Sequence, residues 1–262
     1  MEPENIKAWE EAETERSVGA ANRVDVEKLK MPSSRIERYL APPLNTWHAL
    51  EYCFALLGDV KDKVVLDYGC GDGINTLLLL RRGACVKALD ISPELIDLAR
   101  KRLEVNEING DVEFIVGSAH DIPLPNKSVD IVFGMAILHH LDLGLSVKEV
   151  KRVLKNGGRA IFNEPVRNSG VVKFARKLVP YQAPDVSPYE RPLSDKELRT
   201  FGKEFSSYAS RGFTLPTTEF LENFSLLQGK VKKISSLFDQ SVMNLIPGLK
   251  HFAGRRVVEL TK

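Results

Sequence analysis

The chain has 262 residues, of which 43% are hydrophobic and 27% are charged, so it can bury a core and lacks the composition of a disordered protein. Its 37 basic and 35 acidic residues give a net charge of +2, which does not indicate a protein that binds nucleic acid or a membrane surface. The three cysteines lack the spacing of a disulfide framework or a metal site, the polar N-terminus is unlike a signal or transit peptide, and no apolar run approaches the ~20 residues of a membrane span. We therefore expect a cytoplasmic protein with no metal site.

The first 45 residues show helical patterns and no strand pattern. Glu10, Glu11, Glu13 and Glu15 are typical of a solvated helix, and a second short helix is expected before the proline pair at 42–43. Residues 1–45 are therefore predicted to form a helical N-terminal arm or cap, and residues 46–262 the main domain.

From about residue 63 the pattern changes to an alternation of strands and helices. Strands are predicted over residues 64–66, 85–89, 112–116, 130–133 and 159–163, and the helices between them over 74–82, 93–106 and 147–154. Strands separated by helices of this length are joined by right-handed crossovers and lie parallel in one sheet. The sequence therefore predicts a doubly wound α/β domain.

After residue 165 the alternation stops. Four prolines between residues 180 and 192 are typical of an inserted lid, which we place at about residues 166–204, with Ser194 and Glu197 as the capping box of a short helix. Two late strands are expected at 205–208 and 256–260, joined by a helical stretch over 216–245.

A glycine-rich turn follows the first strand. Gly69, Gly71 and Gly73 allow backbone N–H groups to approach a ligand, and Asp90, 21 residues after Gly69, ends the second strand where a carboxylate accepts hydrogen bonds from ribose hydroxyls. Ile74 stands where a dinucleotide-binding turn has its third glycine, and two carboxylates in or beside the turn disfavour a pyrophosphate. The pattern favours a cationic nucleoside over a dinucleotide.

Six segments in succession then resemble the motifs of class I S-adenosylmethionine-dependent methyltransferases of the type 11 group. They are LDYGCGDG at 66–73, ALDIS at 88–92, GSAHDIPLP at 117–125, VDIVF at 129–133, LHHL at 138–141 and RVLKNGG at 152–158. The resemblance covers about residues 60–165. It implies a Rossmann-like, mostly parallel seven-stranded sheet whose last strand, at 256–260, is antiparallel, and an enzyme that moves a methyl group from S-adenosylmethionine to a small molecule and releases S-adenosylhomocysteine.

The resemblance also implies which residues hold the cofactor. The methionine part is expected at the glycine-rich turn and at the carbonyl of Met135, and the nucleoside part after the second and third strands. Ser118 stands where the family often has an acidic side chain facing adenine, a role that Asp121 or backbone is expected to take here. The expected cofactor residues are Asp67, Gly69, Cys70, Gly71, Gly73, Asp90, Ile91, Ser118, Ala119 and Met135.

An acceptor that attacks through an unactivated hydroxyl or an ammonium group needs a base, and the candidates follow the fourth and fifth strands. Imidazole accepts a proton near neutral pH, so His139 and His140 are candidate bases, and Glu164 is a third. The acceptor is expected between the arm and the lid, at Tyr39, Trp47, His48, Tyr181, Tyr189 and Arg191. We expect a monomer or homodimer that binds no nucleic acid. An RNA-directed methyltransferase and a non-catalytic S-adenosylmethionine-binding module are the alternatives, and a dehydrogenase ranks last.

Overall fold

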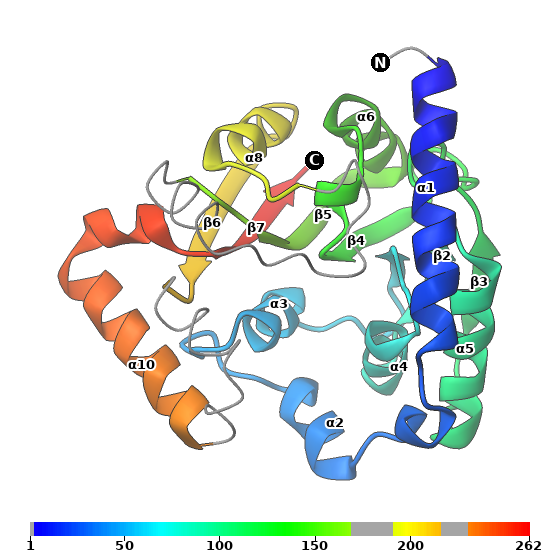
Figure 1. Ribbon diagram of the computed structural model, residues 1–262, viewed down its shortest axis with the longest axis horizontal. Coiled ribbons are helices and arrows are strands. Elements are labelled where there is room, and N and C mark those ends of the chain that lie inside the picture. Colours follow the sequence, from blue (N-terminus) through cyan, green and yellow to red (C-terminus); the bar gives the residue numbers. More distant parts are fainter. Residues whose placement is uncertain (1–2, 169–190, 216–229) are drawn as a thin grey trace.

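A seven-stranded sheet forms the centre of the computed structural model, which describes residues 3–168, 191–215 and 230–262 (Figure 1). The strand order is β3-β2-β1-β4-β5-β7-β6. Their bounds are β1 Val64–Tyr68, β2 Cys85–Asp90, β3 Val112–Val116, β4 Val129–Met135, β5 Leu154–Pro165, β6 Ser207–Phe213 and β7 Arg255–Thr261. Strands β1 to β5 pair in parallel, and β7 is antiparallel to both of its neighbours. The Rossmann-like fold with an antiparallel last strand is confirmed.

Helices cover both faces of the sheet (Figure 1). The α-helices are α1 Pro3–Asn22, α2 Ser33–Leu40, α3 Ala49–Leu57, α4 Ile74–Arg81, α5 Pro93–Val105, α6 Leu143–Val153, α8 Asp195–Gly202 and α10 Lys230–Leu245, and the 3-10 helices are η1 Val26–Leu29, η2 Leu138–His140 and η3 Pro247–Phe252. One cluster of buried apolar residues packs helices α2, α3, α4 and α5 against one face of the sheet. A second cluster packs α6 and α8 against the other face. None of the helices within the described ranges is long and apolar enough to cross a membrane.

Several boundaries differ from the sequence prediction. Helix α6 begins at Leu143, four residues earlier than expected, because the carboxylate of Asp142 caps it by accepting from the N–H groups of Gly144 (2.9 Å) and Leu145 (3.0 Å). Strand β6 starts at Ser207 rather than at residue 205. Phe205 precedes the strand, and its ring stacks on the ring of Phe201 in α8.

The predicted lid and the stretch that joins the late strands are described in part. Helix α8 begins with the predicted capping box of Ser194 and Glu197, and α10 is the described end of the helical stretch expected over 216–245. Residues 169–190, with Tyr181 and Tyr189, and residues 216–229 lie outside the described residues.

The strand order reverses between β1 and β4, since β2 and β3 lie on one side of β1 and β5 to β7 on the other side of β4. In an open α/β sheet, ligands bind beyond the carboxyl ends of the strands at this point. A ligand site is therefore expected beyond the ends of β1, β2 and β4.

Candidate active site

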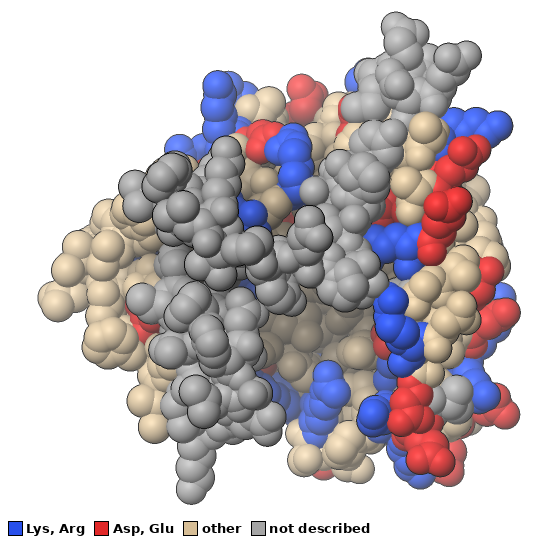
Figure 2. Space-filling view, in the orientation of Figure 1, with Lys and Arg blue, Asp and Glu red and all other residues tan. Residues whose placement is uncertain are grey.

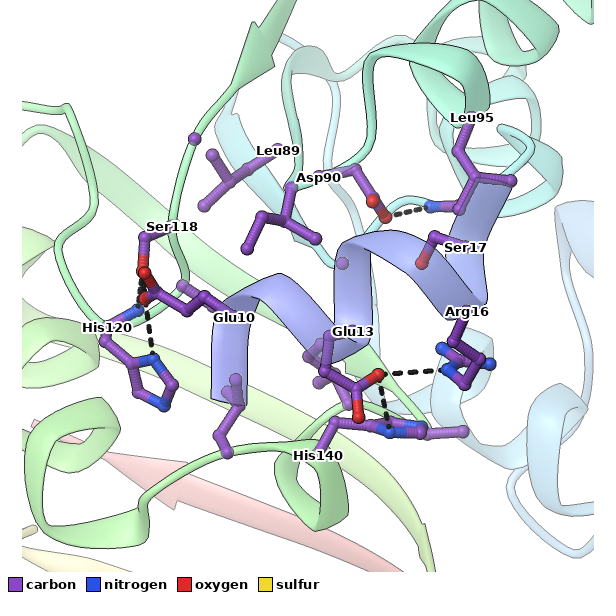
Figure 3. Close-up of a pocket in the computed structure, with 18 of the residues that line it drawn as sticks. Glu10, Glu13, Arg16, Ser17, Leu89, Asp90, Leu95, Ser118, His120 and His140 are labelled. Carbon is purple, nitrogen blue, oxygen red and sulfur yellow. Dashed lines mark hydrogen bonds and ion pairs between the residues drawn. The ribbon is translucent and has the colours of Figure 1, made fainter. Parts of the chain in front are cut away.

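A cavity of about 230 Å³ lies at that position, between the carboxyl ends of β1, β2 and β4 and helix α1 (Figure 3). Its walls come from the glycine-rich turn, the ends of β2 and β3, the loop after β4, and one face of α1. The residues that line it are Trp9, Glu10, Glu13, Arg16, Ser17, Gly69, Gly71, Leu89, Asp90, Ile91, Leu95, Gly117, Ser118, Ala119, His120, Met135, Ala136, Ile137, His140 and Leu141.

The glycine-rich turn opens the cavity on the side of β1. Gly71 has a φ of 54°, and a Cβ built there would meet no atom within 4 Å, so its backbone is accessible to a ligand. Gly73 serves packing instead. A Cβ at this position would lie 2.7 Å from the Cβ of Ala99, so α4 approaches α5 closely only because residue 73 is glycine.

Asp90 presents a carboxylate at the cavity wall. Its two oxygens accept hydrogen bonds from the N–H groups of Gly71 (2.8 Å) and Ser92 (3.0 Å), which fix the orientation of the side chain. Burial raises the pKa of this carboxyl group, and the backbone donors oppose the rise. Each carboxylate oxygen has a further lone pair, so Asp90 is able to accept hydrogen bonds from a ligand as well.

Asp67 lies beneath the turn and does not line the cavity. One carboxylate oxygen accepts from the hydroxyl of Thr76 (2.6 Å), while the other, Oδ1, is buried without a hydrogen-bond partner. The side chain is fully buried, and this burial raises the pKa of Asp67 to about 7. Asp67 therefore lies behind the cavity wall, below the glycine-rich turn.

Helix α1 forms the opposite wall, and its acidic residues are not all solvated as the sequence suggested. Trp9 and Glu13 are buried, and both line the cavity together with Arg16, from one face of the helix. Figure 3 shows the paired side chains of Glu13 and Arg16 beside His140. Burial raises the pKa of Asp90, and the positive charge of Arg16 opposes part of this rise from across the cavity. The arm thus supplies part of the site.

Glu10 joins α1 to the loop after β3. Its Oε1 accepts from the hydroxyl of Ser118 and lies 3.0 Å from Nδ1 of His120 (Figure 3). The Nε2 of His120 accepts from the N–H of Asp142 (2.9 Å), so this ring is neutral and its Nδ1–H donates to Glu10. A carboxylate thus stands beside Ser118, supplied by α1 rather than by Asp121, which does not line the cavity.

The two histidines of η2 have separate carboxylate partners. His140 lines the cavity, and its Nδ1 lies 3.2 Å from Oε2 of Glu13, which also pairs with Arg16 at 2.9 Å (Figure 3). His139 does not line the cavity, and its Nδ1 lies 2.8 Å from Oε2 of Glu164.

Glu164 positions the loop that holds both histidines. It is fully buried, and its Oε1 accepts from the N–H groups of Ile137 (3.0 Å) and Leu138 (2.9 Å). All of these contacts are internal, so Glu164 orients η2 from below and is not placed to take a proton from an acceptor.

Seven of the ten expected cofactor residues line the cavity, and Asp67, Cys70 and Gly73 lie behind it. None of the described residues that we expected at the acceptor lines it. Tyr39 is buried in the core against Phe54, with ring centroids 5.4 Å apart, Trp47 and His48 contact each other, and the exposed side chain of Arg191 pairs with Glu197.

Sequence reasoning missed the contribution of α1. A signal was present, because Trp9, Glu13 and Arg16 have the i, i+4 and i+7 spacing of residues on one face of a helix. It was obscured because the expected stripe of apolar residues is replaced by charged ones, a pattern that is more often a solvated surface.

Comparisons with known proteins agree with this geometry. Residues 66–162 match the family described as "Methyltransferase domain". An uncharacterized methyltransferase of Mycobacterium tuberculosis is 39% identical over 95 residues, which cover 36% of this chain and 37% of that protein. The fatty-acid O-methyltransferase of Mycolicibacterium smegmatis is 28% identical over 164 residues, 62% of this chain and 58% of that protein.

Solved structures show the same fold. The geranyl diphosphate C-methyltransferase of Streptomyces coelicolor A3(2) has a TM-score of 0.55 and 20% identity over 80% of this chain and 76% of that chain. The chain spans only 37% and 58% of the length of the two curated relatives above. Residues 66–162 are thus similar to a methyltransferase domain, and the likeness of the longer chain to the solved structures is one of fold.

Proposed function

We propose that this chain binds S-adenosylmethionine in the cavity under α1 and catalyses transfer of its methyl group to a small-molecule acceptor. The observation that carries the proposal is the placement of the Asp90 carboxylate, the open backbone of Gly71 and the imidazole of His140 around one cavity at the point where the strand order reverses. The similar structure from Streptomyces coelicolor contains S-adenosylhomocysteine, and the relatives include O-methyltransferases, which supports the same assignment.

The donor and acceptor groups of the cavity fit this cofactor. Asp90 has carboxylate lone pairs for ribose hydroxyls, Leu89, Ile91 and Leu95 offer apolar surface to a purine, and the backbone at Gly71 is open to the methionine part. The buried Oδ1 of Asp67, which has no partner, suits the ammonium group, reached directly or through water. When bound, S-adenosylmethionine supplies a methyl group activated by the positive charge on sulfur.

The chain's own part in the reaction is to orient the acceptor, exclude water and remove a proton. His140 is the proposed base, because it is the histidine of η2 that lines the cavity. With its Nδ1 toward Glu13, the ring is oriented so that Nε2 accepts the proton, and the Glu13 carboxylate stabilises the imidazolium that results. Helix α1 covers these groups and keeps bulk water from them.

The acceptor class follows from the need for a base. A hydroxyl or ammonium group must lose a proton to attack, so an acceptor of that kind makes use of His140. We propose that the protein is a monomer or a homodimer. We also propose a cytoplasmic location. Residues 1–45 are proposed as the arm that caps the cofactor, and residues 166–204 as the insertion that borders the acceptor.

Calorimetric titration tests the cofactor assignment first. The wild type should bind S-adenosylmethionine and S-adenosylhomocysteine but not NAD, and Asp90→Ala should lose most of this affinity while keeping its fold by circular dichroism. Asp97→Ala, an exposed acid on α5, is the matched control and should bind like the wild type. A folded wild-type protein that binds neither sulfur nucleoside would rule the proposal out.

A second experiment tests the proton-removal step. A screen of hydroxyl and amine acceptors, read by release of S-adenosylhomocysteine, should identify substrates whose turnover falls in Glu13→Gln with little change in KM and with a shifted pH profile. The exposed neighbour Glu11→Gln should match the wild type. Equal loss in both variants would assign the effect to the helix as a whole and remove Glu13 from the mechanism.

A further inference from the structure

A second cavity, of about 480 Å³, lies between helix α8, strand β6 and the α10–η3 segment, and no part of the proposed mechanism uses it. It differs from the first cavity in charge. Four of its lining residues are lysine or arginine, against a single carboxylate; the four are Arg199, Arg211, Lys250 and Arg256, and the carboxylate is Asp195.

Arg256 is the buried member of this group. Its side chain forms a two-pronged pair with Asp195, with Nε at 2.7 Å and Nη2 at 2.8 Å from the two carboxylate oxygens, and only 5% of the residue is exposed. The remaining nitrogen, Nη1, is buried with no hydrogen-bond partner and lies against Gly212, another lining residue. A buried donor without an acceptor lowers the stability of a fold, so its presence here requires an explanation.

The other cations of the cavity are not neutralised by acids. Within the described residues, no carboxylate lies within 4.0 Å of a side-chain nitrogen of Arg199, Arg211 or Lys250. Arg211 is engaged elsewhere, because its guanidinium donates to the carbonyl oxygens of Leu44 (2.8 Å) and Thr46 (2.9 Å) and lies 4.8 Å from the ring centroids of Tyr52 and Phe213. The side chain of Arg211 is on the opposite face of the sheet from that of Arg256, so Arg199 and Lys250 are the cations available to a ligand beside Arg256. Like charges held around one cavity raise its potential and attract an anion.

The register of the sheet relates this cavity to the candidate active site. In the antiparallel ladders, Arg256 stands opposite Glu164 on β5 and opposite Gly212 on β6. Residues directly opposite each other in such ladders point to the same face of the sheet, so the Arg256 guanidinium and the Glu164 carboxylate share a face on neighbouring strands. A ligand in the second cavity therefore lies two strands from the loop that holds His140.

We propose that the second cavity is a binding site for a phosphate-class oxyanion, either a free inorganic ion or a phosphate group on a larger molecule. The guanidinium groups match phosphate oxygens in geometry, the Lys250 ammonium adds a point charge, and Nη1 of Arg256 gains its missing acceptor. Binding to this site does not require the methyl-transfer reaction, so its test is independent of the function proposed above.

The test is calorimetric titration of the full chain with inorganic pyrophosphate, without S-adenosylmethionine and at constant ionic strength. Arg199→Ala and Lys250→Ala change exposed side chains and should each weaken pyrophosphate binding at least tenfold. Lys196→Ala removes an exposed cation of the same helix α8 that does not line the cavity and should bind like the wild type.

The outcomes separate the alternatives. No binding by the wild type, or equal weakening by Lys196→Ala, would overturn the proposal, because the effect would then be one of net charge. If ethyl phosphate displaces pyrophosphate, the site accepts a phosphate carried on carbon. If pyrophosphate binds and ethyl phosphate does not displace it, the ligand is the free inorganic ion.

Discussion

Asp67 is a buried carboxylate whose environment opposes its ionisation. Because burial raises its pKa to about 7 in the folded protein from 3.8, the folded state favours the protonated form. The stability that this preference contributes is fully present below about pH 4 and is lost as the pH rises through about 7. Above pH 7 the Asp67 carboxylate in the folded protein is ionised, and only one of its two oxygens accepts a hydrogen bond.

Asp67→Asn should therefore raise the free energy of unfolding at pH 8 by at most about 4 kcal/mol, which is three pKa units at about 1.4 kcal/mol each. The amide oxygen still accepts from Thr76, so the hydrogen bond at this position is kept. Urea unfolding at pH 5 and pH 8 measures the difference, which should be smaller at pH 5. Asp97→Asn, on the exposed face of α5, should show no such dependence, and a stabilisation that is the same at both pH values would contradict the expected titration.

The same residue shows what the sequence made predictable. The turn at 69–73 and the acid at residue 90 each follow a strand, so a local pattern placed Asp90 at the cavity. Whether a carboxylate faces the cavity or lies beneath the turn depends on side-chain packing, and so the pattern did not separate Asp67 from Asp90. Likewise, the adjacent His139 and His140 were equivalent in sequence, and only the turn of η2 directs His140 inward.

At the scale of elements, the contact between α4 and α5 depends on one glycine. Gly73 has a φ of 80°, and an added Cβ would meet both the Cβ and the Cα of Ala99, at 2.7 and 2.8 Å. Gly73→Ala should lower the free energy of unfolding by about 2–4 kcal/mol, from the left-handed backbone and the clash together.

Gly157→Ala is the matched control for this substitution. Gly157 also has a positive φ, of 74°, but a Cβ there meets no atom within 4 Å. Its substitution should cost only the backbone part, about 1–2 kcal/mol. Equal destabilisation of the two variants in urea would show that the α4–α5 contact relaxes freely around the new methyl group.

Helix α1 was predictable as a helix but not as a wall of the site. Its contacts join residues far apart in the chain, such as Glu10 and His120, which are 110 positions apart. Nothing local in the sequence specifies such a pairing, whereas the βα units are specified by patterns of ten to fifteen residues. The mostly parallel sheet with its antiparallel last strand was therefore predicted, and the contacts of the covering helix were not.

At the scale of the whole molecule, the net charge is small, at +2. On the face shown in Figure 2, basic and acidic side chains alternate along the edge formed by α1 and α5. Such a surface generates no long-range field of one sign, so association with bulk RNA should be weak and should change little between low and physiological salt. A steep salt dependence in a filter-binding measurement would contradict this expectation and favour a nucleic-acid substrate.

The cavity under α1 is smaller than the about 300–1,000 Å³ typical of small-molecule sites, and polar contacts of Glu10 and Glu13 hold the helix over it. We therefore expect α1 to lift when a ligand enters. In stopped-flow mixing, a Trp47→Phe variant leaves Trp9 as the single tryptophan reporter, and its observed rate should level off as S-adenosylhomocysteine concentration rises. A rate that increased linearly throughout would mean that the entrance is already open. With a gated entrance, the product leaves no faster than the helix opens, so the turnover of this protein has a ceiling set by a segment that takes no part in bond making or breaking.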